Sequence, residues 1–378
     1  MDERLIGVQL GMNVGMKVLW LLSLLWVWSL AQHLPPCEKG KDSYGEWIPV
    51  SELSRSELLM KDYERHFYGG KSGEAKEFGS VWVPAGCSMH RFTNATVHLA
   101  VQHLISKHNY NENRVHLLFM GDSASRGIFC GLVRLLSGSE VYGPCYNTVC
   151  GDWIRNAVST SSIGKYFDTD FGDNFRITFV YIESFYVHHF DWALEFAVTV
   201  VQPSHLILNM GAWDFDAIAR AHMNETASPY CDSNETRAIS DRRADAFTNE
   251  TMWLFGNKAK EFGNRVIYRN NHYNKRFGVF CADEKFEALL KGSPWEVLDS
   301  RRISEKVWLY QNWDGFHFDR FKQDTPEHHK LGHDYDEKVN KTYFLGMMEM
   351  QFVQTMLNSV FYEALDEIRS KHEKRKGK

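Results

Sequence analysis

A serine stands where an apolar run ends and a helix pattern begins, in Gly121-Asp122-Ser123. The run before it, residues 115–120, is typical of a buried strand, and Gly121 permits a tight exit from that strand. A serine at a helix start lies beside free backbone N–H groups, which can bind the oxyanion formed when its hydroxyl attacks an acyl carbonyl. Alternatively, Asp122 or Ser123 simply caps the helix, and this short segment taken alone favours the cap.

A general base and an acid that orients it are expected in Asp314-Gly-Phe-His317. The imidazole of His317 could take the proton of Ser123, while Asp314 could fix the imidazole tautomer and stabilise the imidazolium. Asp-x-x-His arises easily by chance in a chain with 17 histidines. Its position is more informative, because it follows the last predicted strand and precedes the final helix.

Two uncharged hydrogen-bond donors follow another predicted strand, in Asn209-Met210-Gly211. An amide side chain and a glycine N–H are fixed dipoles of the kind that bind an oxyanion. The alternative is a turn held by the asparagine side chain. Since all these segments lie at strand ends of one predicted sheet, we expect Ser123, Asp314 and His317 to be catalytic. Asn209 and Gly211 are then the oxyanion donors.

The elements that must position these residues alternate between strand and helix length from about residue 110, which is typical of an α/β protein. We expect a three-layer α/β/α sandwich around a parallel five-stranded sheet, with ligands bound beyond the carboxyl ends of the strands. The predicted strands are Val115–Met120, Phe175–Glu183, His205–Met210, Arg265–Arg269 and Val307–Gln311. The predicted helices are Ser125–Leu136, Asp191–Val200, Arg237–Phe262, Glu284–Lys291 and Tyr343–Lys371.

The chain of 378 residues contains no internal repeat or long linker. Residues 18–31 form an apolar segment after Lys17, shorter than the ~20 residues of a bilayer span, so a cleaved signal peptide is slightly favoured over an uncleaved anchor. We therefore divide the chain into a signal peptide or anchor (1–31), an amino-terminal extension packing on the catalytic domain (32–110), the catalytic domain (111–370) and a basic tail (371–378).

Cysteines and glycosylation motifs favour the secretory pathway, in the lumen or outside the cell. The seven cysteines lack the spacing of a zinc site, and we expect pairs Cys37–Cys87, Cys145–Cys150 and Cys231–Cys281, with Cys130 buried on a helix. The five Asn-x-Thr acceptors are Asn94, Asn224, Asn234, Asn249 and Asn340.

The net charge of −5 and the absence of a basic stripe argue against a nucleic-acid partner. We expect no cofactor and no metal ion, because the histidine-rich segment 327–334 matches no standard zinc spacing and is typical of a solvated loop. A membrane contact is expected only through a possible amino-terminal anchor. The sequence leaves the oligomeric state open.

Gly121-Asp122-Ser123 and Asp314-x-x-His317 resemble the first and last blocks of the SGNH (GDSL-type) hydrolase superfamily, and more narrowly its PC-esterase branch. The narrower likeness rests on Gly45-Glu46-Trp47, Trp82-Val-Pro-Ala-Gly-Cys87, Arg126 three residues after Ser123, and Asn209-x-Gly211 followed by Trp213. The order Asn209-x-Gly211 differs from the usual Gly-x-Asn-Asp of the superfamily. The resemblance implies a flavodoxin-like fold, acyl-ester chemistry through a seryl intermediate, and an acylated glycan or small ester as substrate.

Other polar residues near the predicted strand ends are further candidates for the site. Arg126 could bind a substrate carboxylate or stabilise charge near the oxyanion, or pair with a structural acid. His188-His189 are more typical of surface residues, and Arg269-Asn-Asn-His272 could contact substrate. A second class of function is a glycoprotein that keeps the fold as a binding or structural module without turnover.

Overall fold

The computed structural model describes part of the chain, and every structural statement refers to that part. It comprises residues 34–49, 80–137, 166–182, 193–194, 197–209, 253–261, 264–272, 287–288, 290–305, 347–365 and 368. Several predicted features lie outside these residues: the amino-terminal segment 1–31, the strand 307–311, Gly211, Asp314, His317, the segments 188–189 and 327–334, the basic tail, and every predicted disulfide except one.

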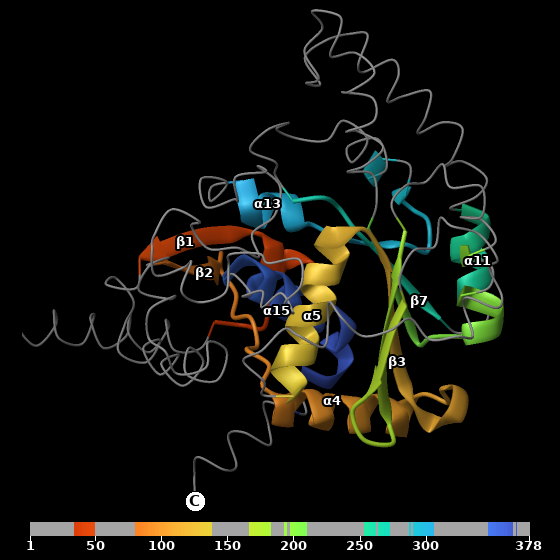
Figure 1. Cartoon of the computed structure of the whole chain (residues 1–378). Coiled ribbons are helices and arrows are strands. Elements are labelled where there is room, and N and C mark those ends of the chain that lie inside the picture. The colour runs from red at the N-terminus through yellow and green to blue at the C-terminus, as the bar shows by residue number, and fades with distance from the viewer. Residues whose placement is uncertain are drawn as a thin grey trace, which may run out of the picture.

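A six-stranded, mostly parallel sheet forms the centre of the fold, which confirms the predicted α/β class (Figure 1). Five strands run parallel in the order β5-β3-β6-β7-β8, and β4 pairs antiparallel with β5 at one edge. The strands are β3 (Val115–Gly121), β4 (Tyr166–Asp170), β5 (Phe175–Tyr181), β6 (His205–Asn209), β7 (Arg265–Arg269) and β8 (Glu296–Leu298).

Four predicted strands correspond to β3, β5, β6 and β7, with ends that differ by at most two residues. The strands β4 and β8 were not predicted. The sequence of β4, Tyr-Phe-Asp-Thr-Asp, has little of the apolar character of a buried strand, because β4 is an edge strand joined to β5 by the turn 171–174. The strand β8 is only three residues long, too short for a periodic pattern.

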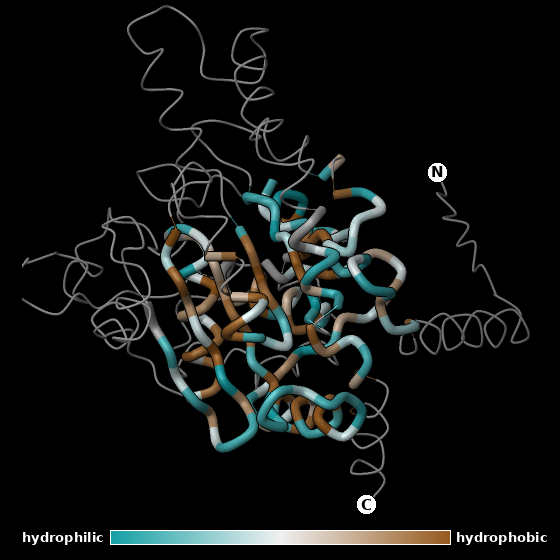
Figure 2. Tube along the Cα trace, turned by 90° about the vertical axis from the view of Figure 1, so that its right-hand side faces the viewer, coloured by the Kyte–Doolittle hydropathy of each residue, from teal (hydrophilic) through white to brown (hydrophobic). Residues whose placement is uncertain are grey.

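Helices cover both faces of the sheet, and alternating strand residues supply two separate cores. On one face, Leu117 and Phe119 pack with α4 (Asn94–Lys107), α5 (Ser123–Ser137) and α15 (Met347–Val360). On the other face, Leu118 and Met120 pack with α11 (Trp253–Glu261) and the π-helical turn η5 (Ala197–Val201). Figure 2 shows the apolar residues running through the interior and hydrophilic residues on the outer loops.

The two upstream motifs that carry the resemblance form one antiparallel pair, β1 (Gly45–Pro49) and β2 (Ser80–Pro84). Gly45 lies so close to the backbone of β2 that a Cβ would overlap the carbonyl of Val83. The indole of Trp47 donates to the carbonyl of Ile303 in α13 (Ser300–Ser304) at 2.8 Å. The indole of the buried Trp82 donates to the carbonyl of Asp42 at 2.8 Å. The pair is therefore fixed to the elements beside the sheet.

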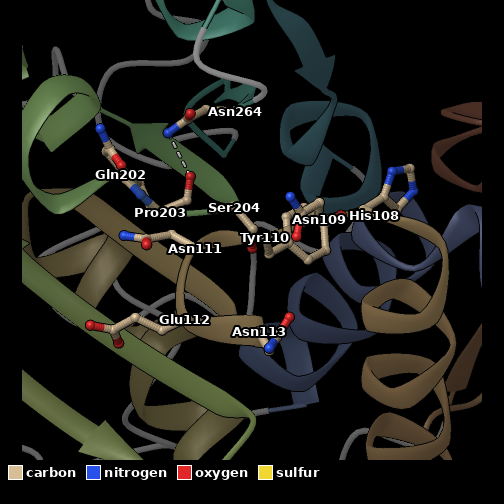
Figure 3. A pocket seen from close by; sticks show the side chains of 10 residues that line it. All are labelled: His108, Asn109, Tyr110, Asn111, Glu112, Asn113, Gln202, Pro203, Ser204 and Asn264. Carbon is tan, nitrogen blue, oxygen red and sulfur yellow. Dashed lines mark hydrogen bonds between the residues drawn. The ribbon is translucent and has the colours of Figure 1, made fainter.

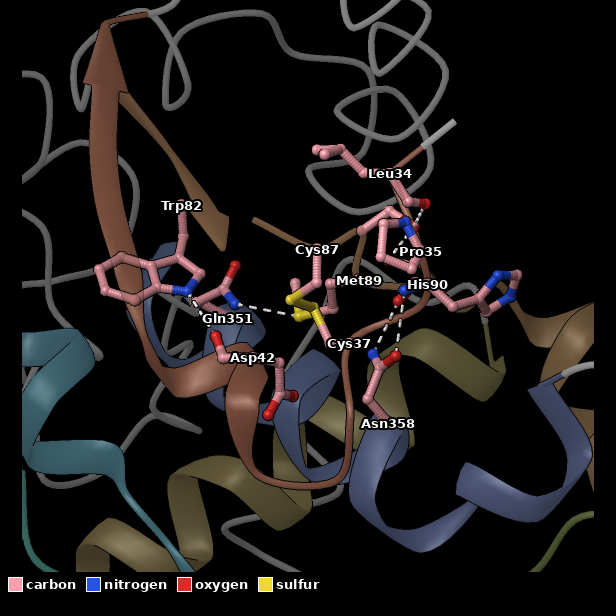
Figure 4. Close-up of a disulfide and its surroundings, with 11 residues drawn as sticks. Leu34, Pro35, Cys37, Asp42, Trp82, Cys87, Met89, His90, Gln351 and Asn358 are labelled. Atoms are coloured by element: carbon pink, nitrogen blue, oxygen red, sulfur yellow. Dashed lines mark hydrogen bonds between the residues drawn. A yellow bond between two sulfur atoms is a disulfide. The ribbon is translucent and has the colours of Figure 1, made fainter. Parts of the chain in front are cut away.

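A disulfide joins Cys37 to Cys87, as predicted, and Figure 4 shows it beside α15. It closes the segment that contains β1 and β2, and it indicates an oxidising, secretory-type compartment. Cys130 is buried on α5, again as predicted. Within the described residues, no helix is long and apolar enough to cross a membrane.

Side chains of α15 hold the extended segment that precedes α4. The Gln354 amide accepts from the N–H of Phe92 at 2.7 Å and donates to its carbonyl at 3.0 Å. One turn later, the Asn358 amide accepts from the N–H of His90 at 3.0 Å and donates to its carbonyl at 2.7 Å. These two amides replace the strand partner that the segment lacks, because buried backbone groups must be paired. Asn94, one of the predicted glycosylation sites, is exposed at the start of α4, where its amide donates a hydrogen bond to the carbonyl of Leu136 at 2.6 Å.

Candidate functional site

The order of the sheet makes the carboxyl ends of β3 and β6 the expected position of a ligand site. After β3 the chain passes through α5 on one face to β5, whereas after β6 it passes through α11 on the opposite face to β7. The neighbouring strands β3 and β6 are thus followed by connections on opposite faces. This is the topological switch point at which open α/β sheets bind ligands. Ser123 and Asn209 lie on its two sides.

Gly121 is the residue that brings these two sides together. A Cβ at this position would overlap the backbone carbonyl of Asn209 and the hydroxyl of Ser125. The first of these atoms belongs to the backbone and cannot rotate away. Only glycine therefore lets the end of β3 pack directly against the end of β6.

Asp122 caps the helix that follows. Its Oδ1 accepts from the N–H of Ala124 at 2.9 Å, and its carbonyl accepts from the N–H of Arg126 at 3.1 Å. Ser123 is therefore the first residue of α5, and of the two residues that the sequence offered as caps, Asp122 fills that role. The first N–H groups of a helix have no acceptor within the helix, so the backbone N–H of Ser123 stands at the positive end of α5.

The side chain of Asn209 links three elements at the carboxyl ends of the strands. Its side chain is completely buried. The Nδ2 group donates to the carbonyl of Arg269 at 2.8 Å and to Oδ1 of Asn271 at 3.1 Å. Its Oδ1 accepts from the hydroxyl of Ser125 at 3.3 Å and from the guanidinium of Arg269. Both amide hydrogens are thus already engaged, so in this arrangement the amide holds β6, β7 and α5 in register.

The four residues Arg269 to His272, which the sequence suggested as substrate contacts, are all buried at the end of β7 and directly after it. Arg269, exposed by only 1%, also lies 5.9 Å from the ring centre of Phe352 on α15, and the imidazole of His272 stacks on the same ring. Asn270 donates to Glu287 at 2.7 Å and to Asp299 at 2.9 Å. These residues are therefore engaged in packing and hydrogen bonds within the protein at this end of the sheet.

Arg126 lies half-buried on α5, about one turn after Ser123. Gly211, Asp314 and His317 lie outside the described residues, so the geometry of the expected triad stays a prediction. Sequence reasoning did not find that Ser125 and Arg269 bond to Asn209. The only signal was that polar residues directly follow two apolar strand patterns.

Among the described residues, no group of three histidine, cysteine, aspartate or glutamate side chains could hold a metal ion. Comparison of the chain with models of known protein families and with curated protein sequences finds no match.

Proposed function

We propose that this protein is a serine acyl-ester enzyme of the secretory pathway, an O-acetylesterase or O-acetyltransferase acting on a glycan or another hydroxyl-bearing substrate. The observation that carries the proposal is the position of Ser123. It begins a capped helix at the switch point of the sheet, where Gly121 allows close packing against Asn209. A helix start at this edge favours an anionic or developing negative charge beside it.

The fold that we propose is flavodoxin-like, as the resemblance to SGNH hydrolases implies. In chain order, the five parallel strands stand in the sheet as second, first, third, fourth and fifth, which is the flavodoxin strand order. The antiparallel β4 extends this core at one edge.

In the proposed reaction, the hydroxyl oxygen of Ser123 attacks the carbonyl carbon of an acetyl ester while His317 accepts the hydroxyl proton. The tetrahedral oxyanion collapses, and the bond to the alcohol oxygen breaks. His317 returns its proton to that oxygen, which leaves an acetyl group on Ser123. Water or a sugar hydroxyl then attacks the acetyl carbon and gives its proton to His317. As the bond between the acetyl carbon and the Ser123 oxygen breaks, His317 returns that proton to the Ser123 oxygen, which restores the hydroxyl. Asp314 orients the imidazole throughout.

The backbone N–H of Ser123 is the oxyanion donor that the described geometry supports best, with Gly211 as its expected companion. Asn209 was the third expected donor. Its amide would have to give up a hydrogen bond to Arg269 or Asn271 in order to donate to an oxyanion. We therefore assign to Asn209 the role of positioning the strand ends around Ser123.

The test is reaction of the folded protein with a serine-directed fluorophosphonate and with a chromogenic acetyl ester. We expect labelling and turnover in the natural chain, and loss of both in Ser123→Ala. Ser137→Ala, at the exposed far end of the same helix, is the matched control and should behave like the natural chain.

No labelling and no turnover in folded protein would contradict the enzyme proposal and favour a glycoprotein module without turnover. Release of acetate into water, compared with transfer to an added sugar, separates an esterase from a transferase. This comparison should be made on a panel of acetylated glycans, since the two activities differ only in which hydroxyl enters the site in the second half of the reaction.

A further inference from the structure

A cavity of about 610 Å³ opens at the edge of the sheet opposite to Ser123 (Figure 3). It is bounded by the loop between α4 and β3, the loop before β6 and the residue before β7. These strands are parallel, so the cavity lies at their amino ends, whereas Ser123 follows the carboxyl end of β3. The seven residues of β3 separate the two places by about 23 Å. The cavity is therefore separate from the proposed catalytic site.

The lining is rich in uncharged hydrogen-bonding groups. It includes five side-chain amides, from Asn109, Asn111, Asn113, Gln202 and Asn264. An amide offers both donors and an acceptor, which matches a ligand whose hydroxyls donate and accept at once. Within the described part of the chain, the first three of these amides make no hydrogen bond, so they are available to a ligand.

The charges around the cavity are balanced. Glu112 is the one carboxylate in the lining and pairs with Arg114 at 3.7 Å. The His108 ring lies 2.8 Å from a carboxylate oxygen of Glu363. Among the described residues that line the cavity there is no lysine or arginine. Such a lining has no feature that would select an anionic ligand.

An aromatic ring completes the cavity. Tyr110 is half-buried, and the ring centres of His108 and His205 lie 5.3 Å and 6.4 Å from its own. The pKa of the Tyr110 hydroxyl is raised to about 12, mainly by burial, so this hydroxyl stays protonated. A fixed aromatic ring with a polar tip offers an apolar face to a ligand that also carries hydroxyls.

The shape of the cavity is held by its backbone. Glu112, Asn113 and Gln202 are the three non-glycine residues with left-handed φ among those described, and all three line the cavity. Strained conformations persist only where the surrounding structure fixes them. Here the N–H of Asn113 donates to the carbonyl of Tyr110, and the amide of Asn264 donates to the carbonyl of Pro203 (Figure 3). The cavity is thus formed before any ligand arrives.

We propose that this cavity binds a neutral saccharide unit of a glycan, independently of chemistry at Ser123. Its volume is in the range of small-molecule sites, and its amides and half-buried aromatic ring suit the hydroxyls and apolar face of a sugar ring. Such a site would hold a glycan chain at a second point, on the side of the sheet away from the reacting ester.

The test is saturation-transfer NMR on the full chain with free disaccharides of glucose, galactose, N-acetylglucosamine, mannose and xylose at about 10 mM, where weak sites are occupied. Lactose and sialyllactose form a neutral and charged pair. We expect saturation transfer from the protein to at least one neutral disaccharide, and no preference for sialyllactose over lactose. Asn111→Ala and Tyr110→Ala should each weaken binding about tenfold, because each removes a direct contact. Asn257→Ala, at an exposed position of α11, should change nothing.

Absence of transfer to every neutral disaccharide would overturn the proposal, and so would binding that is unchanged in Asn111→Ala. If the protein binds sialyllactose but does not bind lactose, the proposal that the ligand is a neutral saccharide is refuted. Asn111 is exposed, so its variant should fold, and Tyr110→Phe keeps the ring if Tyr110→Ala does not fold. These results do not depend on whether Ser123 reacts with a fluorophosphonate.

Discussion

Replacement of Asp42 by asparagine should stabilise the protein at neutral pH. Asp42 lies in the short 3₁₀ turn η1 (Lys41–Ser43), where its carbonyl accepts from the indole of Trp82 (Figure 4). Asp42 is 2% exposed, and among the described residues neither of its carboxylate oxygens accepts a hydrogen bond of good geometry. Burial raises the pKa of Asp42 to about 7 from 3.8, against smaller opposing effects of the nearby N–H groups of Asp42 and Ser43 and the charge of Arg91.

The sign of the effect follows from linkage. The folded state holds the Asp42 proton more tightly than the unfolded state, so folding stability is highest below pH 3.8 and falls as the pH rises through about 7. The shift from 3.8 to about 7 corresponds to about 4 kcal/mol lost at pH 8. Asparagine has nearly the same shape and never ionises. The unfolding free energy of the variant should therefore exceed that of the natural chain by about 2 kcal/mol near pH 5 and by about 4 kcal/mol near pH 8.

The assay is urea unfolding of both proteins at a series of pH values, with the difference in unfolding free energy plotted against pH. The difference removes the contribution of His116, whose pKa burial lowers to about 4 and which destabilises the fold below pH 6.5 in both proteins alike. Asp173→Asn, at an exposed turn, is the control and should give a small, flat difference. A flat difference for Asp42→Asn would refute the reasoning, since it would mean that Asp42 is not desolvated.

Three further predictions concern stability. Replacing Cys87 by serine opens the disulfide, whose residues are separated by 50 positions, and should lower the unfolding free energy by about 4 kcal/mol by the loop-entropy relation; thermal unfolding with and without reductant measures it. Gly121→Ala forces a methyl group against the carbonyl of Asn209, so it should lower the free energy of unfolding by about 1–3 kcal/mol and abolish fluorophosphonate labelling. An unchanged urea midpoint would contradict the close approach of the two strand ends. Gln354→Met leaves the backbone N–H and carbonyl of Phe92 buried without partners, so it should lower the free energy of unfolding in urea by about 2–4 kcal/mol. A decrease below about 0.5 kcal/mol would mean that water replaces the amide.

The strands that the sequence predicted correctly are those buried on both faces. In β3 every residue is buried, so its sequence is a continuous apolar run that ends sharply at Gly121. In β4, Asp168 and Asp170 are exposed, and they pair with arginines of neighbouring segments. Those pairs are tertiary contacts, which a local pattern does not contain.

The candidate site likewise contains features that the sequence predicted and features that it did not. Asp122 as a helix cap was among the expected alternatives, because its role depends on hydrogen bonds to residues two and four positions along the chain. The bonds of Asn209 join residues 60 and 62 positions apart, and no spacing rule predicts such pairs. The polar cavity at the opposite edge was not predicted either, since it is formed by three loops that are remote in sequence.

The buried polar residues at the carboxyl edge of the sheet argue for precise positioning. Asn209, Arg269 and Asn271 are almost fully buried, where apolar side chains would avoid the penalty of desolvation. Hydrogen bonds give what apolar packing does not, namely a fixed geometry for each atom. The Asn209 amide connects the end of β6 to β7 and, through Ser125, to the first turn of α5. A fold that required only stability would have no reason to bury this set, whereas one that must fix the position of the start of α5 at the switch point of the sheet would. The network therefore supports a working site at Ser123 on grounds that do not depend on the chemistry of Ser123 itself.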